Sequence, residues 1–81
     1  MAELTVQELA EIFGEVVDLS GIQVSERAVL GQDIPLDSRE MLRVLSRIES
    51  RYRIRLTPED VVSMKTLGDV LDAVRRRAAK R

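Results

Sequence analysis

Four short polar motifs, each of the kind that begins a helix, divide this chain and limit what it can fold into. In each motif a Thr or Asp is followed three residues later by an acidic residue, which is the spacing of a capping box. The motifs occupy residues 5–8, 37–40, 57–60 and 66–69. The third also has a proline at the first helical position, where a backbone N–H is not needed. The chain is therefore predicted to be all-α, with four helices.

Apolar residues recur at helical spacing after these motifs and set the predicted helix bounds. We expect helices over residues 5–19, 37–52, 58–62 and 67–78, three of them longer and one short. Gly14 is expected to mark close packing by a neighbouring element. Basic residues form a tail at about 75–81 that is expected to fray. The second helix is predicted to bury a stripe, border residues included, made of Leu42, Leu45, Ile48, Glu49 and Tyr52, with Met41 and Val44 beside it.

Residues 22–37 show no period and form a long predicted connection between the first two helices. Long ordered loops in small domains are usually functional or packed by their own apolar side chains. This segment holds enough apolar residues to attach to a core, namely Ile22, Val24, Val29, Leu30, Ile34 and Leu36. We therefore expect an ordered crossover and not a disordered linker.

The composition excludes several classes of function. The chain has 81 residues, for which a single domain over residues 1–81 is expected, and it has no cysteine and no histidine. Most metal sites and nucleophilic mechanisms lack their usual side chains in such a chain, so neither a metal site nor an enzyme is predicted. No signal peptide and no apolar run long enough to cross a bilayer is visible, which favours a cytoplasmic protein without membrane insertion.

Charge is divided unevenly along the chain although the formal net charge is only −1. Residues 1–36 carry seven acids and one base, whereas residues 37–56 carry three acids and six bases. Arginines at four-residue spacing form a basic stripe on the second helix, namely Arg39, Arg43, Arg47 and Arg51. The stripe is either a solvated face, compensated by the acidic first helix, or a recognition surface. An acidic pI and the presence of only two aromatic residues argue against nucleic acid as the partner.

Ser38 directly follows Asp37 where the predicted loop meets the second helix. An Asp-Ser pair that opens a helix is often only a cap. A serine at the end of an ordered loop, beside charged residues, is also accessible to a docking enzyme. The residues alone leave both interpretations open, a plain helix start and a covalent attachment site.

Three segments together resemble the acyl carrier protein family. They are residues 33–38 (DIPLDS) before an amphipathic helix, residues 52–60 (YRIRLTPED) and residues 64–74 (MKTLGDVLDAV). The resemblance covers nearly the whole chain and implies a bundle of four helices with a long first loop. It also implies that Ser38 carries 4′-phosphopantetheine taken from coenzyme A, whose thiol holds acyl groups as thioesters. Such a carrier shuttles acyl intermediates between enzymes of fatty acid, polyketide or related lipid biosynthesis.

The same resemblance implies roles for other residues. Asp37 and Glu40 match positions that contact the phosphopantetheinyl transferase in the family. Apolar residues of the bundle resemble the lining of a groove for the acyl chain, namely Leu42, Leu45, Ile48, Ile54 and Leu71. For each of these residues a plain core role without any ligand is an equal alternative.

The second helix departs from the family pattern. Arg39 stands where an apolar residue is usual, Arg43 where an acid is common, and Arg47 continues the inversion; Pro35 replaces a common glycine. Because charge complementarity governs partner choice, these residues predict a specialised monomeric carrier whose acyl-transferring partners present an acidic face. The alternative is a carrier-like adaptor that binds a protein partner through the arginine-rich helix without a prosthetic group.

Overall fold

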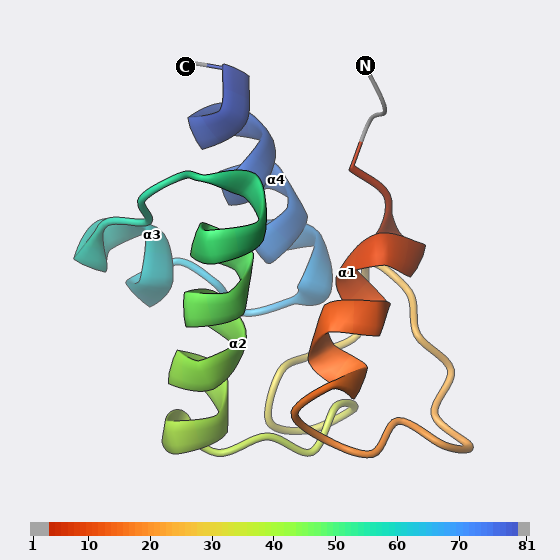
Figure 1. Ribbon diagram of the computed structural model, residues 1–81. Coiled ribbons are helices and arrows are strands. Elements are labelled where there is room, and N and C mark those ends of the chain that lie inside the picture. Colours follow the sequence, from red (N-terminus) through yellow and green to blue (C-terminus); the bar gives the residue numbers. More distant parts are fainter. Residues whose placement is uncertain (1–3, 80–81) are drawn as a thin grey trace.

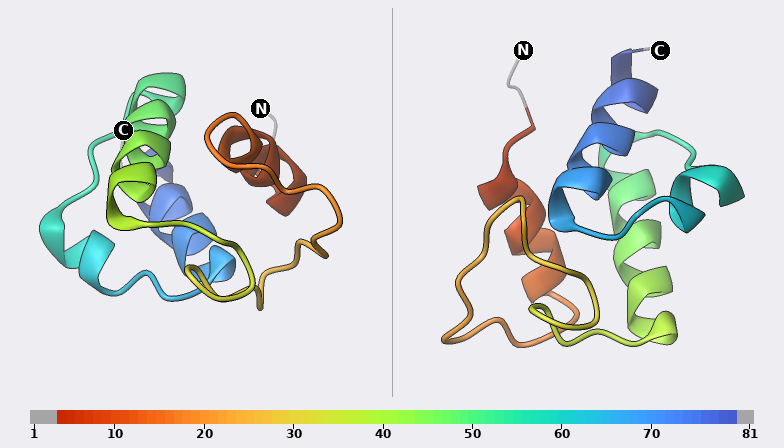
Figure 2. Two further views of the ribbon diagram at one scale, coloured as in Figure 1. Left: turned by 90° about the horizontal axis from the view of Figure 1, so that it is seen from below. Right: turned by 180° about the vertical axis from the view of Figure 1, so that it is seen from behind.

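The computed structural model describes residues 4–79, which form four α-helices and no strand beyond isolated bridges. The helices are α1 (Val6–Gly14), α2 (Ser38–Tyr52), α3 (Pro58–Val62) and α4 (Leu67–Ala79). α1 packs against both α2 and α4. The short α3 lies on the side of the bundle away from α1, as both views show (Figures 1 and 2). The prediction of an all-α bundle with three longer helices and one short helix is confirmed.

The hydrophobic core lies between α1, α2 and α4. Phe13 is its largest fully buried side chain. The prediction of a buried side chain in α2 is right for Leu45 and Ile48 and wrong for Leu42, which is 64% exposed. Val44, Leu45 and Ile48 form the buried face of α2. Each residue turns an α-helix by about 100°, so Leu42, the residue after Met41, lies at the edge of that face and not within it. The other fully buried large residues are Leu9, Ile12, Ile34, Leu67, Val70, Leu71 and Val74.

α1 is shorter than predicted, because the helix ends at Gly14 and not at Leu19. The backbone N–H of Glu15 reaches the carbonyls of Glu11, Ile12 and Phe13, and only one further turn follows. Glycine and β-branched valines have weak helix propensity, which fits an early end at this point. The prediction of close packing at Gly14 is also wrong, since a Cβ atom there would meet nothing within 4 Å.

The connection between α1 and α2 is an ordered crossover, as predicted. The N–H of Leu30 donates to the carbonyl of Lys65 at 2.9 Å, and the N–H of Leu67 donates to the carbonyl of Ala28 at the same distance. Ile34 is fully buried. The crossover thus runs past the beginning of α4 before it reaches α2 (Figure 2).

The basic segment that was expected to fray is helical as far as the structure describes it. Residues 75–79 form the last turns of α4, and residues 80–81 lie outside the described residues. Arg75 donates to the carbonyl of Leu4 at 2.9 Å, and Arg77 binds Asp60 of α3. These side chains hold the end of α4 to the rest of the bundle. Among residues 4–79, no helix has the length and apolar character to span a bilayer.

Candidate functional site

Ser38 is the first residue of α2, and its position is fixed by the residue before it. The Asp37 carboxylate accepts a hydrogen bond from the N–H of Glu40 at 2.7 Å, and the Glu40 carboxylate accepts one from the N–H of Asp37 at 2.9 Å. This reciprocal capping box is the one predicted from the sequence. Because Asp37 caps the helix, Ser38 is not needed as a cap. Its side chain is exposed, and no hydrogen bond of its hydroxyl occurs within residues 4–79.

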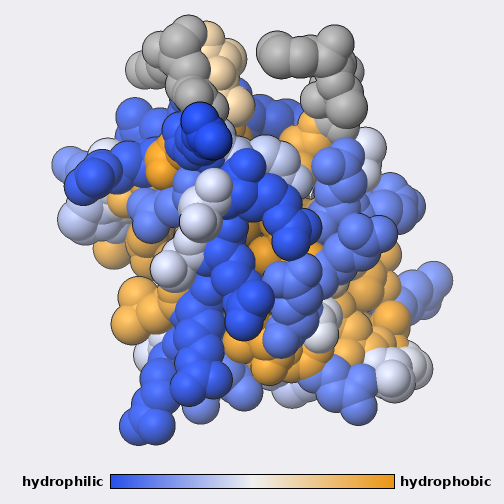
Figure 3. Space-filling model, in the orientation of Figure 1, coloured by the Kyte–Doolittle hydropathy of each residue, from blue (hydrophilic) through white to orange (hydrophobic). Residues whose placement is uncertain are grey.

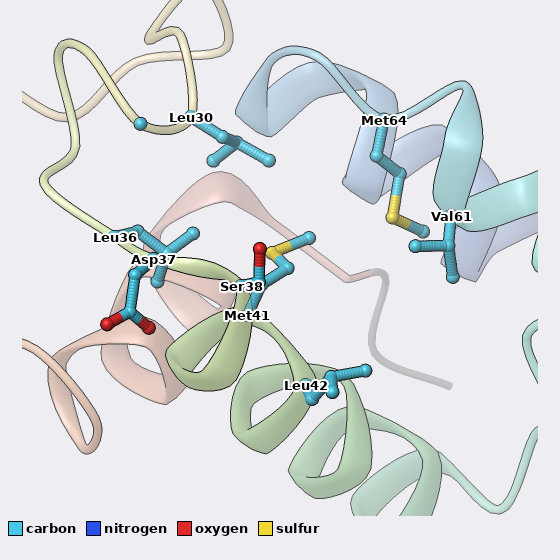
Figure 4. Close-up of a pocket in the computed structure, with 9 residues that line it drawn as sticks. Leu30, Leu36, Asp37, Ser38, Met41, Leu42, Val61 and Met64 are labelled. Carbon is cyan, nitrogen blue, oxygen red and sulfur yellow. The ribbon is translucent and has the colours of Figure 1, made fainter.

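A cavity of about 350 Å³ opens beside Ser38. It lies between the crossover loop, the first turns of α2, and α3 with the segment after it. Figure 4 shows Ser38 next to Met41 at one side, with Val61 and Met64 across from them and the Asp37 carboxylate turned away. The lining is mostly apolar and consists of Leu30, Gly31, Leu36, Asp37, Ser38, Met41, Leu42, Val61 and Met64.

The loop wall of this cavity is held by backbone hydrogen bonds. Leu30 is tied to Lys65 as described above, which places its side chain at the cavity. Gly31 follows with a φ of 88°, a left-handed conformation that a residue with a Cβ rarely adopts. Its N–H donates to the carbonyl of Ile34 at 2.8 Å, which closes a tight turn. The Asp33 carboxylate accepts from the N–H of Val29 at 2.9 Å and stabilises the same turn.

Of the apolar residues predicted for an acyl groove, Leu42 is the one that lines this cavity. Leu45, Ile48 and Leu71 lie in the core, and Ile54 is partly buried against that core. Sequence reasoning missed five apolar lining residues, namely Leu30, Leu36, Met41, Val61 and Met64. They come from the aperiodic loop, the edge of α2 and the short helix. The available signal was their apolar character on either side of the Asp-Ser pair.

The arginine stripe of α2 is divided by an ion pair with α1. Arg47 and Arg51 bind the two carboxylate oxygens of Glu15 at 3.1 Å and 3.0 Å. The hydrogen bond from Arg51, together with Arg47, lowers the pKa of Glu15. Arg39 and Arg43 are exposed and have no ion pair with another residue of the 4–79 range. The compensation of the stripe by the acidic first helix is thus confirmed for two of its four arginines.

Charged and polar side chains cover much of the face that includes α2. In Figure 3 this surface is predominantly blue, and orange apolar surface shows at its sides and in gaps between the blue side chains. Leu42 and Val62 are the large apolar residues most exposed, at 64% and 80%. Leu42 lies between Arg39 and Arg43 in the sequence, so the first turns of α2 carry both positive charge and an apolar side chain beside Ser38.

Comparison with known proteins decides the family. A family model for the phosphopantetheine attachment site matches residues 7–74. The chain belongs to this family of carrier proteins. It is similar to the acyl carrier protein of Acidothermus cellulolyticus, with 30% identity over 66 residues, which are 82% of this chain and 79% of the relative.

Two further relatives agree with this assignment. The chain is 28% identical over 68 residues to the meromycolate extension acyl carrier protein of Mycolicibacterium aurum, covering 84% of this chain and 70% of the relative. It is 26% identical over 83 residues to the acyl carrier protein of Rhodococcus erythropolis, covering 99% of this chain and 91% of the relative. The protein is an acyl carrier, and 4′-phosphopantetheine is its prosthetic group. A phosphopantetheinyl transferase and acyl-handling enzymes are the classes of partner that the family implies.

The residues near Ser38 fit such a group. An attachment site needs a hydroxyl that an enzyme can reach, and Ser38 is exposed with no hydrogen bond from its side chain to the described part of the chain. An acyl chain on the group needs apolar surface within reach, and the cavity beside Ser38 presents leucine, methionine and valine side chains.

Proposed function

We propose that Ser38 carries the phosphopantetheine group and that the protein shuttles acyl intermediates between enzymes of lipid biosynthesis without catalysing a step itself. The observation that carries this proposal is the exposed Ser38 hydroxyl at the rim of an apolar cavity. The group supplies a terminal thiol on which acyl chains are held as thioesters. One relative is named for meromycolate extension, and this name supports a role in lipid biosynthesis over a role in other acyl chemistry.

Different residues of the chain present Ser38 to the transferase and bury the acyl chain. The capping box of Asp37 and Glu40 fixes the start of α2, so that Ser38 is presented in one position to a docking transferase. The apolar wall of the cavity removes part of an acyl chain from water, which favours its retention. Leu42 contributes to this wall directly. A contribution of Leu45, Ile48, Ile54 and Leu71 to the acyl groove stays a prediction.

Partner recognition is assigned to the start of α2. Arg39 and Arg43 are exposed beside Ser38, while Arg47 is engaged with Glu15 and is available only when that exposed pair opens. We therefore expect the partner enzymes to present acidic residues opposite Arg39 and Arg43. Asp37 and Glu40, which match transferase-contacting positions of the family, complete this surface. The cytoplasmic location and the monomeric state stay predictions from the sequence.

Intact-mass spectrometry tests the attachment directly. The protein is incubated with coenzyme A and a broad-specificity phosphopantetheinyl transferase. We expect a gain of one phosphopantetheine group in the wild type and in Ser46→Ala, which removes another exposed serine of α2. Ser38→Ala is expected to show no gain. Absence of any gain in the wild type would instead favour the adaptor that works without a prosthetic group.

A further inference from the structure

The short helix α3 is held in place in an unusual way. A helix of five residues has too few internal hydrogen bonds to be stable alone, so it depends on tertiary contacts. Only one of its residues is buried, and this residue is a charged one, Asp60, at 5% exposure. Its two valines are less buried: Val61 is at the cavity, and Val62 is 80% exposed. The middle of α3 is therefore fixed mainly by a carboxylate, and its apolar packing is limited to Val61, which is partly buried against the core.

The Asp60 carboxylate binds the last turns of α4. Its Oδ2 accepts from Arg77 Nε at 2.8 Å, and its Oδ1 accepts from the second guanidinium nitrogen of Arg77 at 3.1 Å. Such two-point pairs between arginine and carboxylate are stronger and more directional than single hydrogen bonds. Arg76 lies 3.6 Å from the same carboxylate. We call the Asp60–Arg77 pair the clasp.

The clasp and the cap of α3 share the same atoms. The Asp60 carboxylate also accepts from the N–H of Thr57 at 2.9 Å, and the Thr57 hydroxyl accepts from the N–H of Asp60 at 3.1 Å. Arg77 also reaches that hydroxyl at 3.4 Å. Loss of the Arg77 guanidinium would leave a buried carboxylate without its main counter-charge. It would therefore weaken the start of α3 as well as its attachment to α4.

The cavity beside Ser38 depends on where α3 lies. Val61 follows Asp60 in the chain, and both Val61 and Met64 line the cavity opposite Ser38 (Figure 4). We infer that Arg77 is a positioning residue, which holds α3 as the far wall of the cavity through Asp60 and so sets how well the cavity retains an acyl chain. The part of this inference that concerns the acyl chain rests on the proposed function. The part that concerns the position of α3 does not.

Amide hydrogen exchange on the unmodified protein tests the position of α3. The amides to follow are those of Val61 and Ser63, which donate to the carbonyls of Thr57 and Glu59. In Arg77→Gln we expect exchange at both amides to be about tenfold faster, since a charged hydrogen bond is lost, with a smaller change in the core of α2. Equal acceleration throughout the chain, or none in α3, would overturn the inference.

Glu15→Gln is the matched control. It breaks an arginine–carboxylate cluster of similar distances, but this cluster joins α1 to α2 and lies away from the cavity lining. We expect faster exchange in the turn that follows α1, for example at the amide of Val17, which donates to the carbonyl of Phe13, and unchanged exchange in α3. Faster exchange in α3 in this variant would show that α3 responds to general destabilisation and would count against the clasp.

The second measurement uses protein loaded with butyryl, hexanoyl and octanoyl phosphopantetheine from the corresponding acyl coenzyme A. Cleavage of each thioester by hydroxylamine is followed by intact mass. In the wild type and in Glu15→Gln we expect cleavage to slow as the acyl chain lengthens, because longer chains bury more surface. In Arg77→Gln we expect this dependence on length to be lost.

Equal protection of the thioester in Arg77→Gln and wild type would overturn the role of Arg77 in retaining the acyl chain. No length dependence in the wild type would contradict the cavity as the cargo site, while amide exchange would still decide on the clasp.

Discussion

Arg53 is the one non-glycine residue among residues 4–79 with a positive φ. Its backbone angles are φ 55° and ψ 50°, and it ends α2 in the left-handed conformation. Glycine is the usual residue at such a position because a Cβ atom is strained there. The sequence pattern did not predict this feature, because arginine is not a residue that typically adopts the left-handed conformation.

Replacement of Arg53 by glycine is expected to stabilise the fold. Relief of the left-handed strain outweighs the greater chain entropy of glycine, and we expect a gain of about 0.5 kcal/mol in the free energy of unfolding. Urea unfolding measures it. Arg55→Gly is the control, because it removes the same charge from an exposed residue that lacks a positive φ. That control is expected to lose stability, and a similar response of both variants would contradict the argument.

Single-residue burial was predictable only where the period of a helix is unambiguous. Leu45 and Ile48 were placed in the core correctly, and Leu42 was not, because an apolar residue at the edge of a stripe looks the same in a sequence as one at its centre. The edge position is what brings Leu42 to the cavity. The cavity is therefore lined in part by a residue whose packing the pattern could not specify.

At the scale of whole elements, the prediction succeeded where the signals are local. The Thr-Pro-acid motif fixed α3 to its observed bounds, Pro58–Val62, because its caps lie within the same few residues. The end of α1 was missed because the apolar period continues through Val16 and Val17, although Gly14 and these valines are weak helix formers. The attachment of α3 to α4 by Asp60 and Arg77 was missed because it joins residues that lie far apart in the chain.

The clasp should also make stability depend on pH. The guanidinium of Arg77, with the N–H of Thr57, holds the pKa of Asp60 well below its usual range. The unfolded chain therefore takes up a proton on Asp60 first as the pH falls. The stability that Asp60 contributes is fully present above its ordinary pKa, near about 4, and is lost as the pH falls toward the lowered value.

We expect the difference in unfolding free energy between wild type and Arg77→Gln to be about 2 kcal/mol at neutral pH. It should shrink below about pH 4, where the carboxyl of the unfolded chain becomes protonated. Urea unfolding at a series of pH values provides the measurement. Arg55→Gln is the control, because Arg55 has no ion pair with any residue of the described part of the chain. The difference in unfolding free energy between this variant and wild type should therefore not change with pH. A constant difference for Arg77→Gln would argue against Asp60 as the titrating group.

On the scale of the whole molecule, charge counted from the sequence overstates what a partner meets. Residues 37–56 carry six arginines, but two of those on α2, Arg47 and Arg51, bind Glu15 at the end of α1. The cavity was likewise hidden from sequence reasoning. Its loop wall depends on the bond from Leu30 to Lys65, which joins segments far apart in the chain. The proposed attachment site at Ser38 was predicted because three segments along the chain together resemble the acyl carrier protein family, whereas the Asp-Ser pair alone left a plain helix cap as an alternative.

Reversing the charge at Arg39 and Arg43 should change how efficiently a phosphopantetheinyl transferase modifies the protein. With a transferase whose docking face is basic, we expect the double variant Arg39→Glu and Arg43→Glu to raise kcat/KM about tenfold at low salt. The gain should diminish at high salt, where exposed charges are screened. Steady-state transfer from coenzyme A measures both.

The matched control for this experiment is the double variant Arg53→Glu and Arg55→Glu. It makes the same change in net charge at exposed residues beyond the end of α2, away from Ser38. We expect a much smaller effect on kcat/KM. An equal gain in both double variants would mean that overall charge and not the start of α2 governs docking.

The weak apolar anchoring of α3 has a consequence for how such carriers can diversify. The buried apolar residues of α1, α2 and α4 determine whether the chain folds, whereas α3 contributes a cavity wall and no fully buried apolar side chain. Substitutions of Val61, the residue of α3 that lines the cavity, can therefore alter the shape of the wall while the scaffold survives. If the cavity holds the acyl chain as proposed, cargo preference and foldability become separable traits, and the first can change in evolution without loss of the second.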